Sequence, residues 1–300
     1  MTTGVIDPSA RKTKWELREG DEIAPGRSAL RRLGGGTRYE AYLAFDEHLH
    51  AIVVVKLIRP HLIEHAGALA GLASEVEILD GLDHPVIVRG FGHVLDGPRP
   101  HVVLEHLEGP RLSSLIRRYG PLPPEQLVPL ATQLCSALHY LAAEEIVHLD
   151  VKPSNTIMSA PPRLIDLSVA MPLAAARALE RSRGTDAFMA PEQCDPVALG
   201  PVGAAADVFG LGATLYMAAT GERPFPDADH KSDDPVARWP QLDTDPNPVL
   251  LPSQVAAPVL ACLQRSPVER PSPAELSDAL EPVLGAQAKP RLSGLKPRWS

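Results

Sequence analysis

The chain has 300 residues and a formal net charge of -8, and 44% of its residues are hydrophobic. This length suits one large or two-lobed domain, and the hydrophobic content excludes a disordered tract. The acidic balance argues against nucleic-acid binding, which would need a basic face.

The cysteines and the apolar runs indicate in which cellular compartment the protein functions. Cys135, Cys194 and Cys262 lack metal-ligand spacing and cannot all pair, which is typical of a reducing, cytoplasmic setting. The N-terminus has no signal-peptide pattern, and no stretch reaches about 18 apolar residues. We therefore expect a cytoplasmic protein without a membrane span, whose activating signal arrives through a regulatory partner protein.

The first third of the chain is mainly strand-like. Residues 1–25 are polar and charged, and we expect a flexible lead-in there. Alternating or β-branched runs predict strands, and leucines spaced three and four apart predict one amphipathic helix. The predicted strands are 39–44, 52–58, 86–94 and 101–107, and the predicted helix is 66–81.

Helical patterns dominate the rest of the chain. They cover 124–143, 204–219, 253–265 and 273–284. The closing residues 287–300 form a basic, proline-containing tail. The pattern predicts an α+β fold with a small antiparallel sheet lobe containing one main helix, at about 26–105, and a larger, mostly helical lobe at about 106–286.

Lysine and asparagine are scarce. Only seven of the 29 basic residues are lysines, and asparagine occurs twice, at Asn155 and Asn247. Because these residue types are rare here, a lysine or asparagine that falls within a functional motif is less expected by chance.

Residues 148–155 carry the strongest motif, His-Leu-Asp-Val-Lys-Pro-Ser-Asn. It resembles the catalytic loop of protein kinases, in the style of the bacterial eukaryotic-like serine/threonine kinases. The resemblance implies a two-lobed kinase fold with ATP in the cleft. It also implies that Asp150 is the catalytic base, that Lys152 contacts the γ-phosphate and that Asn155 is a Mg²⁺ ligand.

A second metal ligand is expected eleven residues further on. Asp166-Leu167-Ser168 follows the apolar pair 164–165 and stands where kinases carry Asp-Phe-Gly. The resemblance assigns Asp166 to Mg²⁺ and to the β- and γ-phosphates. Ser168 lacks the backbone freedom of glycine, which restricts flipping of the segment.

Lys56 ends the strand at 52–58 and matches the kinase lysine that holds the α- and β-phosphates. Its expected partner is Glu75, in the predicted helix. Glu77 lies about 200° around that helix and should point away.

The glycine run resembles the hairpin that covers the phosphates in kinases. Gly34 and Gly36 match two of its glycines, and Tyr39 stands at the third. Ala41 replaces the valine that packs on adenine. We expect Tyr39 to distort or open the loop and to weaken ATP binding, because glycines let backbone N–H groups approach phosphate.

The adenine end of the cleft is expected at the last predicted strand of the first lobe. By resemblance, Leu104 guards the back of the pocket, and the backbone from Glu105 to Leu107 forms the hinge.

Downstream motifs complete the resemblance, which covers roughly residues 27–286. Glu192, in an Ala-Pro-Glu segment, is expected to pair with Arg270. Thr185 matches the threonine that contacts the catalytic Asp and Lys, and Asp207 matches the helix residue that anchors the catalytic-loop backbone.

Three functions remain open on these residues. The favoured one is Mg-ATP-dependent transfer of the γ-phosphate to serine or threonine of protein substrates, including the chain itself. The alternative is a pseudokinase or nucleotide-binding scaffold with little or no turnover, which Tyr39 and Ser168 favour. A small-molecule phosphotransferase is disfavoured by the Ala-Pro-Glu segment and Arg270.

Leu149 generates a first prediction. Many kinases carry arginine before the catalytic Asp and use it to bind an activation-loop phosphate, which leucine cannot do. Phosphatase treatment should therefore leave the phosphotransfer rate essentially unchanged. Loss of activity on that treatment, reproduced by Ser182→Ala, would contradict this prediction.

Overall fold

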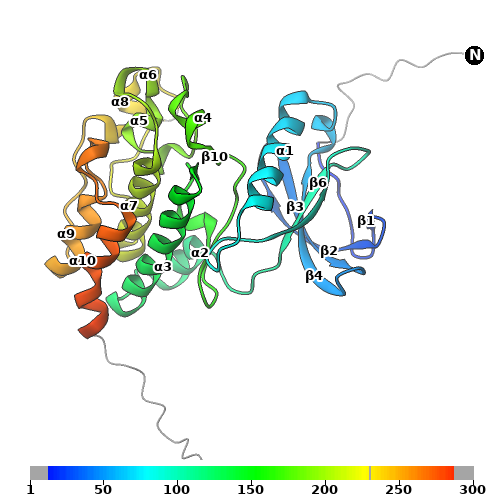
Figure 1. The fold of residues 1–300 in the computed structure, drawn as a ribbon, viewed down its shortest axis with the longest axis horizontal. Helices are drawn as coiled ribbons and strands as arrows, with labels where there is room; N and C mark the ends of the chain where they lie inside the picture. The colour runs from blue at the N-terminus through cyan, green and yellow to red at the C-terminus, as the bar shows by residue number, and fades with distance from the viewer. Residues whose placement is uncertain (1–12, 230, 287–300) are drawn as a thin grey trace, which may run out of the picture.

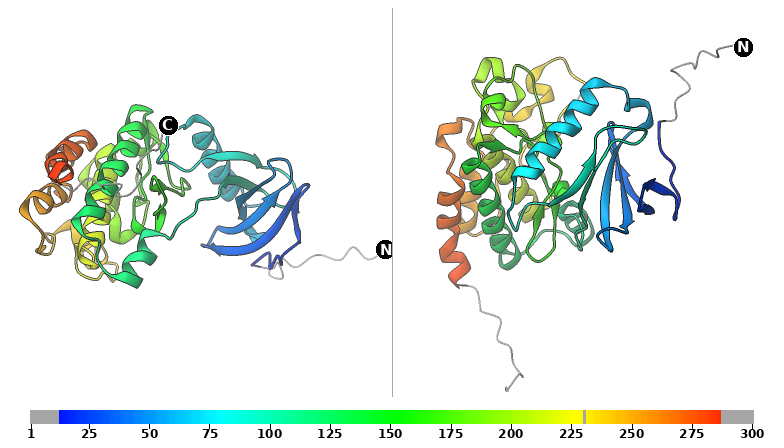
Figure 2. Two further views of the ribbon diagram at one scale, coloured as in Figure 1. Left: turned by 90° about the horizontal axis from the view of Figure 1, so that it is seen from below. Right: turned by 45° about the vertical axis from the view of Figure 1, so that its right-hand side comes forward.

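The computed structural model describes residues 13–229 and 231–286. They form a sheet lobe and a helical lobe that lie side by side (Figures 1 and 2). The predicted α+β architecture is confirmed.

The first lobe is a six-stranded antiparallel sheet in the order β1-β2-β3-β4-β6-β5. Its strands are β1 (Glu22–Ala24), β2 (Arg27–Gly35), β3 (Tyr39–Asp46), β4 (Ala51–Ile58), β5 (Gly90–Val94) and β6 (His101–Glu105). Burial alternates along β3: Tyr42 and Ala44 enter a small core on one face, whereas Tyr39 and Ala41 face the other way, toward the space between the lobes. Helix α1 (Ala66–Gly81) has the predicted bounds and packs against the sheet (Figure 1).

The expected flexible lead-in is wrong for the described residues 13–24. β1 pairs with β2, and Trp15 and Leu17 pack on the small core of the sheet. The indole Nε1 of Trp15 donates a hydrogen bond of 2.8 Å to the carbonyl of Ile58. A few apolar side chains within a polar stretch are enough to fix this segment, since they cover a sheet face that would otherwise meet water. The remaining lead-in, residues 1–12, lies outside the described residues, as does the predicted basic tail at 287–300.

The strand predicted at 86–94 begins only at Gly90. Val86 and Val88 are buried, but their backbone bonds to Leu164 of the second lobe: Leu164 N donates to Val86 O at 2.7 Å, and Val88 N donates to Leu164 O at 3.0 Å. The apolar run joins the two lobes instead of lengthening the sheet. The next strand, β6, likewise ends earlier than predicted, at Glu105.

The second lobe is built on helices α2 (Leu112–Tyr119), α3 (Pro124–Ala143), α7 (Ala204–Thr220), α9 (Ser253–Ala261) and α10 (Pro273–Ala286). Shorter helices are α4 (Leu173–Arg177), α5 (Pro191–Cys194), α6 (Pro196–Leu199) and α8 (Pro235–Arg238), and short strands are β7 (Ile146–Val147), β8 (Thr156–Ile157), β9 (Arg163–Leu164) and β10 (Met171–Pro172). Helix α7 is buried along most of its length and contacts α3 and α9. No helix in the described part of the chain is long and apolar enough to cross a membrane.

The helix predicted at 253–265 ends at Ala261. The carbonyls of Gln264 and Arg265 instead accept hydrogen bonds from the Arg270 guanidinium, at 2.8 and 3.0 Å. Arg270 therefore sets the path of the chain after α9.

The predicted Glu192–Arg270 pair is confirmed as a buried, bidentate interaction. The two guanidinium nitrogens lie 2.6 and 2.7 Å from the two carboxylate oxygens. The Arg270 side chain is 0% exposed and that of Glu192 2%. The guanidinium also lies 5.1 Å from the ring centroid of Phe209 in α7. The pair thus connects α5, which carries Glu192, to the helical core at α7.

A second prediction concerns this pair. Arg270→Ala should lower the free energy of unfolding by about 3–5 kcal/mol, because it leaves the Glu192 carboxylate buried without a counter-charge. Arg223→Ala is the control, because it breaks a 3.7 Å pair with the fully exposed Asp227 and should change stability little. Urea unfolding measures both. Equal losses for the two variants would contradict the prediction.

Candidate active site

A cavity of about 1090 Å³ lies between the lobes. The β2–β3 hairpin, β4, the segment after β6 and residues 165–169 and 179–183 contribute to its wall. Eight of the twelve predicted site residues line it: Gly34, Gly36, Ala41, Lys56, Leu104, Glu105, Leu107 and Asp166. The other four, Glu75, Asp150, Lys152 and Asn155, do not line the cavity and belong to the hydrogen-bonded clusters described next.

The first cluster is centred on the Lys56 ammonium. Its Nζ lies 2.7 and 2.9 Å from the Glu75 carboxylate oxygens and 2.7 Å from Asp166 Oδ1. Burial disfavours the ammonium, but the two carboxylates outweigh it and raise the pKa of Lys56 above its ordinary value. Lys56 therefore stays charged. Glu77 is exposed, as predicted from its place around α1.

Asp166 faces the cavity in a left-handed backbone conformation, with φ +69° and a side chain that is 38% exposed. Burial raises the pKa of this carboxyl, but the nearby Lys56 ammonium outweighs it and holds the pKa well below the usual range. A hydrogen bond from the Ser168 side chain lowers it further. Leu167 is buried in the main core. The changed Asp-Leu-Ser segment therefore keeps Asp166 ionised in the cleft.

The catalytic-loop backbone is held by α7. Asp207 accepts hydrogen bonds of 2.7 Å from both the His148 and Leu149 backbone N–H groups. Leu149 is buried and has φ +62°, and its carbonyl accepts a 3.0 Å hydrogen bond from the Gln193 side chain. The predicted anchoring role of Asp207 is confirmed. It fixes a strained turn immediately before Asp150.

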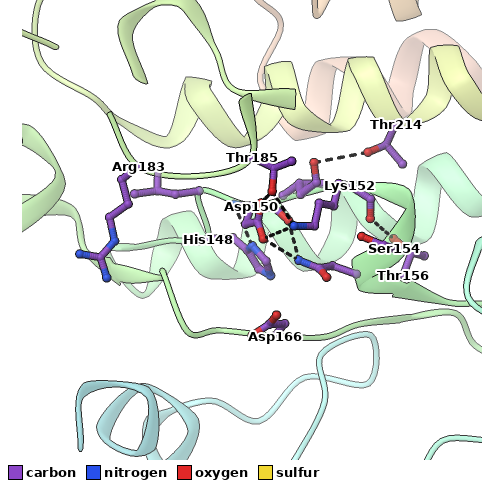
Figure 3. A network of polar contacts seen from close by, with 12 residues as sticks. His148, Asp150, Lys152, Ser154, Thr156, Asp166, Arg183, Thr185 and Thr214 are labelled. Atoms are coloured by element: carbon purple, nitrogen blue, oxygen red, sulfur yellow. Dashed lines mark hydrogen bonds and ion pairs between the residues drawn. The ribbon is translucent and has the colours of Figure 1, made fainter. Parts of the chain in front are cut away.

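The second cluster surrounds the Asp150 carboxylate (Figure 3). Lys152 Nζ donates to Oδ2 at 2.7 Å, and Thr185 Oγ1 donates to Oδ1 at 2.6 Å. Lys152 also donates to Thr185 Oγ1 at 2.6 Å. The Asn155 side-chain nitrogen reaches the carbonyl and Oδ2 of Asp150, at 3.0 and 2.9 Å. The predicted Thr185 contacts are confirmed, and Asp150 is held in one orientation.

Hard oxygen donors are available between the two clusters. The amide nitrogen of Asn155 is used on Asp150, so its carbonyl oxygen is the atom left to bind a cation, together with the Asp166 carboxylate. Among residues 13–229 and 231–286, no group of three or more His, Cys, Asp or Glu could hold a metal. A divalent ion here would therefore take its remaining oxygen ligands from a phosphate and from water, as Mg²⁺ commonly does.

The glycine hairpin differs from the expectation. Tyr39 begins β3, pairs in register with Ile58, and its carbonyl accepts a 3.1 Å hydrogen bond from Gly36 N. The hairpin is closed, so the expected opening by Tyr39 is wrong, although the pairing of β2 with β3 shifts register between Arg32 and Gly34. Sequence reasoning also missed Gly35: a Cβ there would lie 2.6 Å from the Tyr39 carbonyl oxygen, and only glycine fits.

Five arginines on the cavity wall were also missed by sequence reasoning. They are Arg31, Arg38, Arg111, Arg181 and Arg183. Arginine is common throughout this chain, so nothing in the sequence distinguishes these five. Together with Lys56 they make the cavity wall strongly basic, which suits a polyanionic ligand.

The lobes, the Lys56 cluster and the Asp150 cluster define a cleft arranged for phosphoryl transfer. Residues 27–280 match the protein kinase domain family, to which the chain therefore belongs. It is 32% identical over 256 residues to a serine/threonine-protein kinase, PknB, of Mycobacterium leprae, covering 79% of this chain and 39% of that protein.

Two other relatives agree. Identity is 30% over 293 residues with PknB of Mycobacterium tuberculosis (87% of this chain, 46% of that protein) and 30% over 240 residues with the serine/threonine-protein kinase PkaA of Streptomyces coelicolor (77% and 43%). The chain thus spans less than half the length of these relatives. These matches place it among the bacterial eukaryotic-like serine/threonine kinases, a family that generally uses ATP and a divalent metal.

A third prediction tests the anchor of the catalytic loop. Asp207→Asn should lower the free energy of unfolding by about 2 kcal/mol, because an amide offers one acceptor oxygen to two N–H groups and loses the charge that strengthens both bonds. Hydrogen exchange at the His148 and Leu149 amides should accelerate. Asp278→Asn, on the exposed side of α10, is the matched control. Unchanged exchange at both amides would contradict the prediction.

Proposed function

We propose that this protein transfers the γ-phosphate of ATP to serine or threonine hydroxyls of protein substrates, including its own chain. The observation that carries the proposal is the Asp150 carboxylate, which accepts hydrogen bonds from Lys152, Thr185 and Asn155 beside a basic cavity. A decayed site would have no physical reason to keep these three groups within 3 Å of the Asp150 carboxylate.

Asp150 is the group that receives the substrate hydroxyl. Phosphoryl transfer depends mainly on positioning and on charge stabilisation, so the base only orients the hydroxyl and accepts its proton late. Lys152 lies 2.7 Å from Asp150 and offsets the negative charge that develops on the transferred phosphoryl group. Thr185 bonds to both residues and keeps them in register.

The nucleotide occupies the cavity between the lobes. Ala41 and Leu104, which line that cavity, would contact its adenine, and the backbone from Glu105 to Leu107 would form the hinge. The Glu105 side chain is itself held by Arg163 at 3.1 Å, which fixes the start of that hinge. The backbone of Gly34 to Gly36 and the Lys56 ammonium, which line the same cavity, would bind the phosphates of the nucleotide.

Mg²⁺ is the divalent ion that these oxygens suit, with Asn155 and Asp166 as its protein ligands. When bound it neutralises phosphate charge. Asp166 contributes by remaining ionised, since its pKa is held below the usual range. Asn155 contributes by presenting its carbonyl oxygen while its nitrogen orients Asp150.

The scaffold alternative has less support. Tyr39 leaves the hairpin closed, and the Ser168 side chain helps to lower the pKa of Asp166. Neither departure from the family pattern therefore disrupts the arrangement of the candidate active site.

The setting and the partners are part of the proposal. The three cysteines are free and buried, which suits a reducing cytoplasm. A protein substrate and a regulatory partner protein, with no nucleic acid, fit the acidic net charge of -8.

A fourth prediction tests the function directly. The purified chain, incubated with radiolabelled ATP, Mg²⁺ and a mixture of protein substrates, should label serine and threonine. Asp150→Asn should reduce the rate by at least about 100-fold, because a positioned base contributes that much. The variant should still bind nucleotide, since Asp150 does not line the cavity. Wild-type labelling no higher than that of Asp150→Asn, despite measured nucleotide binding, would replace the enzyme with the scaffold.

A further inference from the structure

Tyr39 is the residue whose contacts the catalytic scheme leaves unexplained. We propose that Tyr39 is a positioning residue, which uses its ring to hold the Lys56 ammonium and its hydroxyl to brace helix α1, so that the Lys56–Glu75 pair stays assembled. The proposal deepens the proposed function and rests on it.

The register of the sheet brings Tyr39 to Lys56. Tyr39 lies opposite Ile58, and Ala41 lies opposite Lys56, so Tyr39 and Lys56 are diagonal neighbours on adjacent strands. Diagonal pairs are within reach of aromatic and long side chains on the same face. Both side chains line the cavity. A glycine at position 39 would leave this place empty.

The ring makes the first contact. Lys56 Nζ lies 4.7 Å from the Tyr39 ring centroid, within the range of a cation–π interaction. The same ammonium bonds to Glu75 and Asp166, at 2.7 Å each. Lys56 is therefore held by two carboxylates and one aromatic face. The ring adds attraction without adding a third negative charge.

The hydroxyl lies beside α1, at a glycine. A Cβ built on Gly71 would lie 3.5 Å from the Tyr39 hydroxyl oxygen, the closest neighbour on that side. Gly71 precedes Glu75 by four residues, so the two lie on one face of α1, one turn apart. The Tyr39 hydroxyl thus lies next to the face of the helix that supplies the partner of Lys56, where Gly71 has no side chain to displace it.

These contacts link three elements. The hairpin presents Tyr39, β4 presents Lys56, and α1 presents both Gly71 and Glu75. If α1 moved away from the sheet, it would break the Glu75 pair and also leave the Tyr39 hydroxyl without its neighbour. Leu149 cannot bind an activation-loop phosphate, so an internal brace of this kind replaces a phosphate as the means of keeping α1 in place.

Three substitutions of Tyr39 in the full chain distinguish the effect of the aromatic ring from the effect of side-chain size. Tyr39→Phe keeps the ring, Tyr39→Leu keeps the bulk, and Tyr39→Gly removes both. Lys56 should react faster with an amine-directed acylating reagent in Tyr39→Leu and Tyr39→Gly, by about 2- to 30-fold. In Tyr39→Phe, which keeps the ring and loses only the hydroxyl beside α1, the increase should be smaller. Mass spectrometry measures labelling at Lys56. Tyr119→Leu is the matched control, at a tyrosine that is 71% exposed.

Kinetics give the second readout. The KM for ATP should rise by a similar factor in Tyr39→Leu, and Tyr39→Phe should restore most of the loss. A residue that served only the stability of the fold would lower the active fraction and leave this KM unchanged.

A larger side chain at Gly71, tested with and without the Tyr39 side chain, examines whether the Tyr39 hydroxyl helps to hold α1 in place. Gly71→Val should accelerate labelling of Lys56 in the wild-type background, because its methyl groups displace the Tyr39 hydroxyl. In the Tyr39→Gly background the same change should add little, since the two substitutions remove one shared contact.

Three results would overturn the proposal: wild-type labelling of Lys56 in Tyr39→Leu, additive effects of Gly71→Val and Tyr39→Gly, or a lower KM for ATP in Tyr39→Gly. The last would make Tyr39 an obstruction. If the wild-type chain transfers no phosphate, the proposed function fails, and the labelling of Lys56 still decides the role of Tyr39.

Discussion

The Lys56 ammonium is the point on which the two lobes depend. Its two carboxylate partners come from different parts of the chain, Glu75 in α1 and Asp166 beyond the catalytic loop, and each lies 2.7 Å away. A buried ammonium is costly unless it is paired, so sheet, helix and second lobe must all be in place before the charge is satisfied. The cavity forms around this requirement. The proposed phosphate site is thus a consequence of how one charge is neutralised.

The second lobe uses buried charge in the same way. Asp207 satisfies two backbone N–H groups of the catalytic loop, and Glu192 and Arg270 satisfy each other and set the path after α9. Such groups contribute little net stability compared with apolar packing, but they tolerate only one geometry. They explain how short loops, with little regular structure of their own, hold Asp150 in a fixed place.

The candidate site residues could be predicted because they occur in sequence motifs, and the chemistry of phosphoryl transfer explains the residue types and spacings of those motifs. Lys56, Glu75 and Asp166 could be identified from motifs, and the α+β fold from the change of hydrophobic period. The sequence could not reveal partners made only in three dimensions. Trp15 sits in a polar stretch and still fixes the lead-in. Val86 belongs to an apolar run that is typical of a strand, but its backbone carbonyl accepts a hydrogen bond from Leu164 of the other lobe. Hydrophobic periodicity indicates which side chains are buried and does not indicate which element buries them.

The departures from the family pattern share one physical effect. Tyr39, Leu149 and Ser168 all stand where kinases commonly carry a residue that moves or that binds a mobile phosphate. In this chain Tyr39 packs on Lys56, Leu149 is buried, and the Ser168 side chain helps to lower the pKa of Asp166. Each replaces conformational freedom with a local contact. Loss of function by drift would instead remove contacts, leaving unpaired charges around Lys56 and Asp150. Because Lys56 is paired with Glu75 and Asp166, and Lys152 with Asp150, the substitutions favour a cleft that is assembled before any ligand arrives.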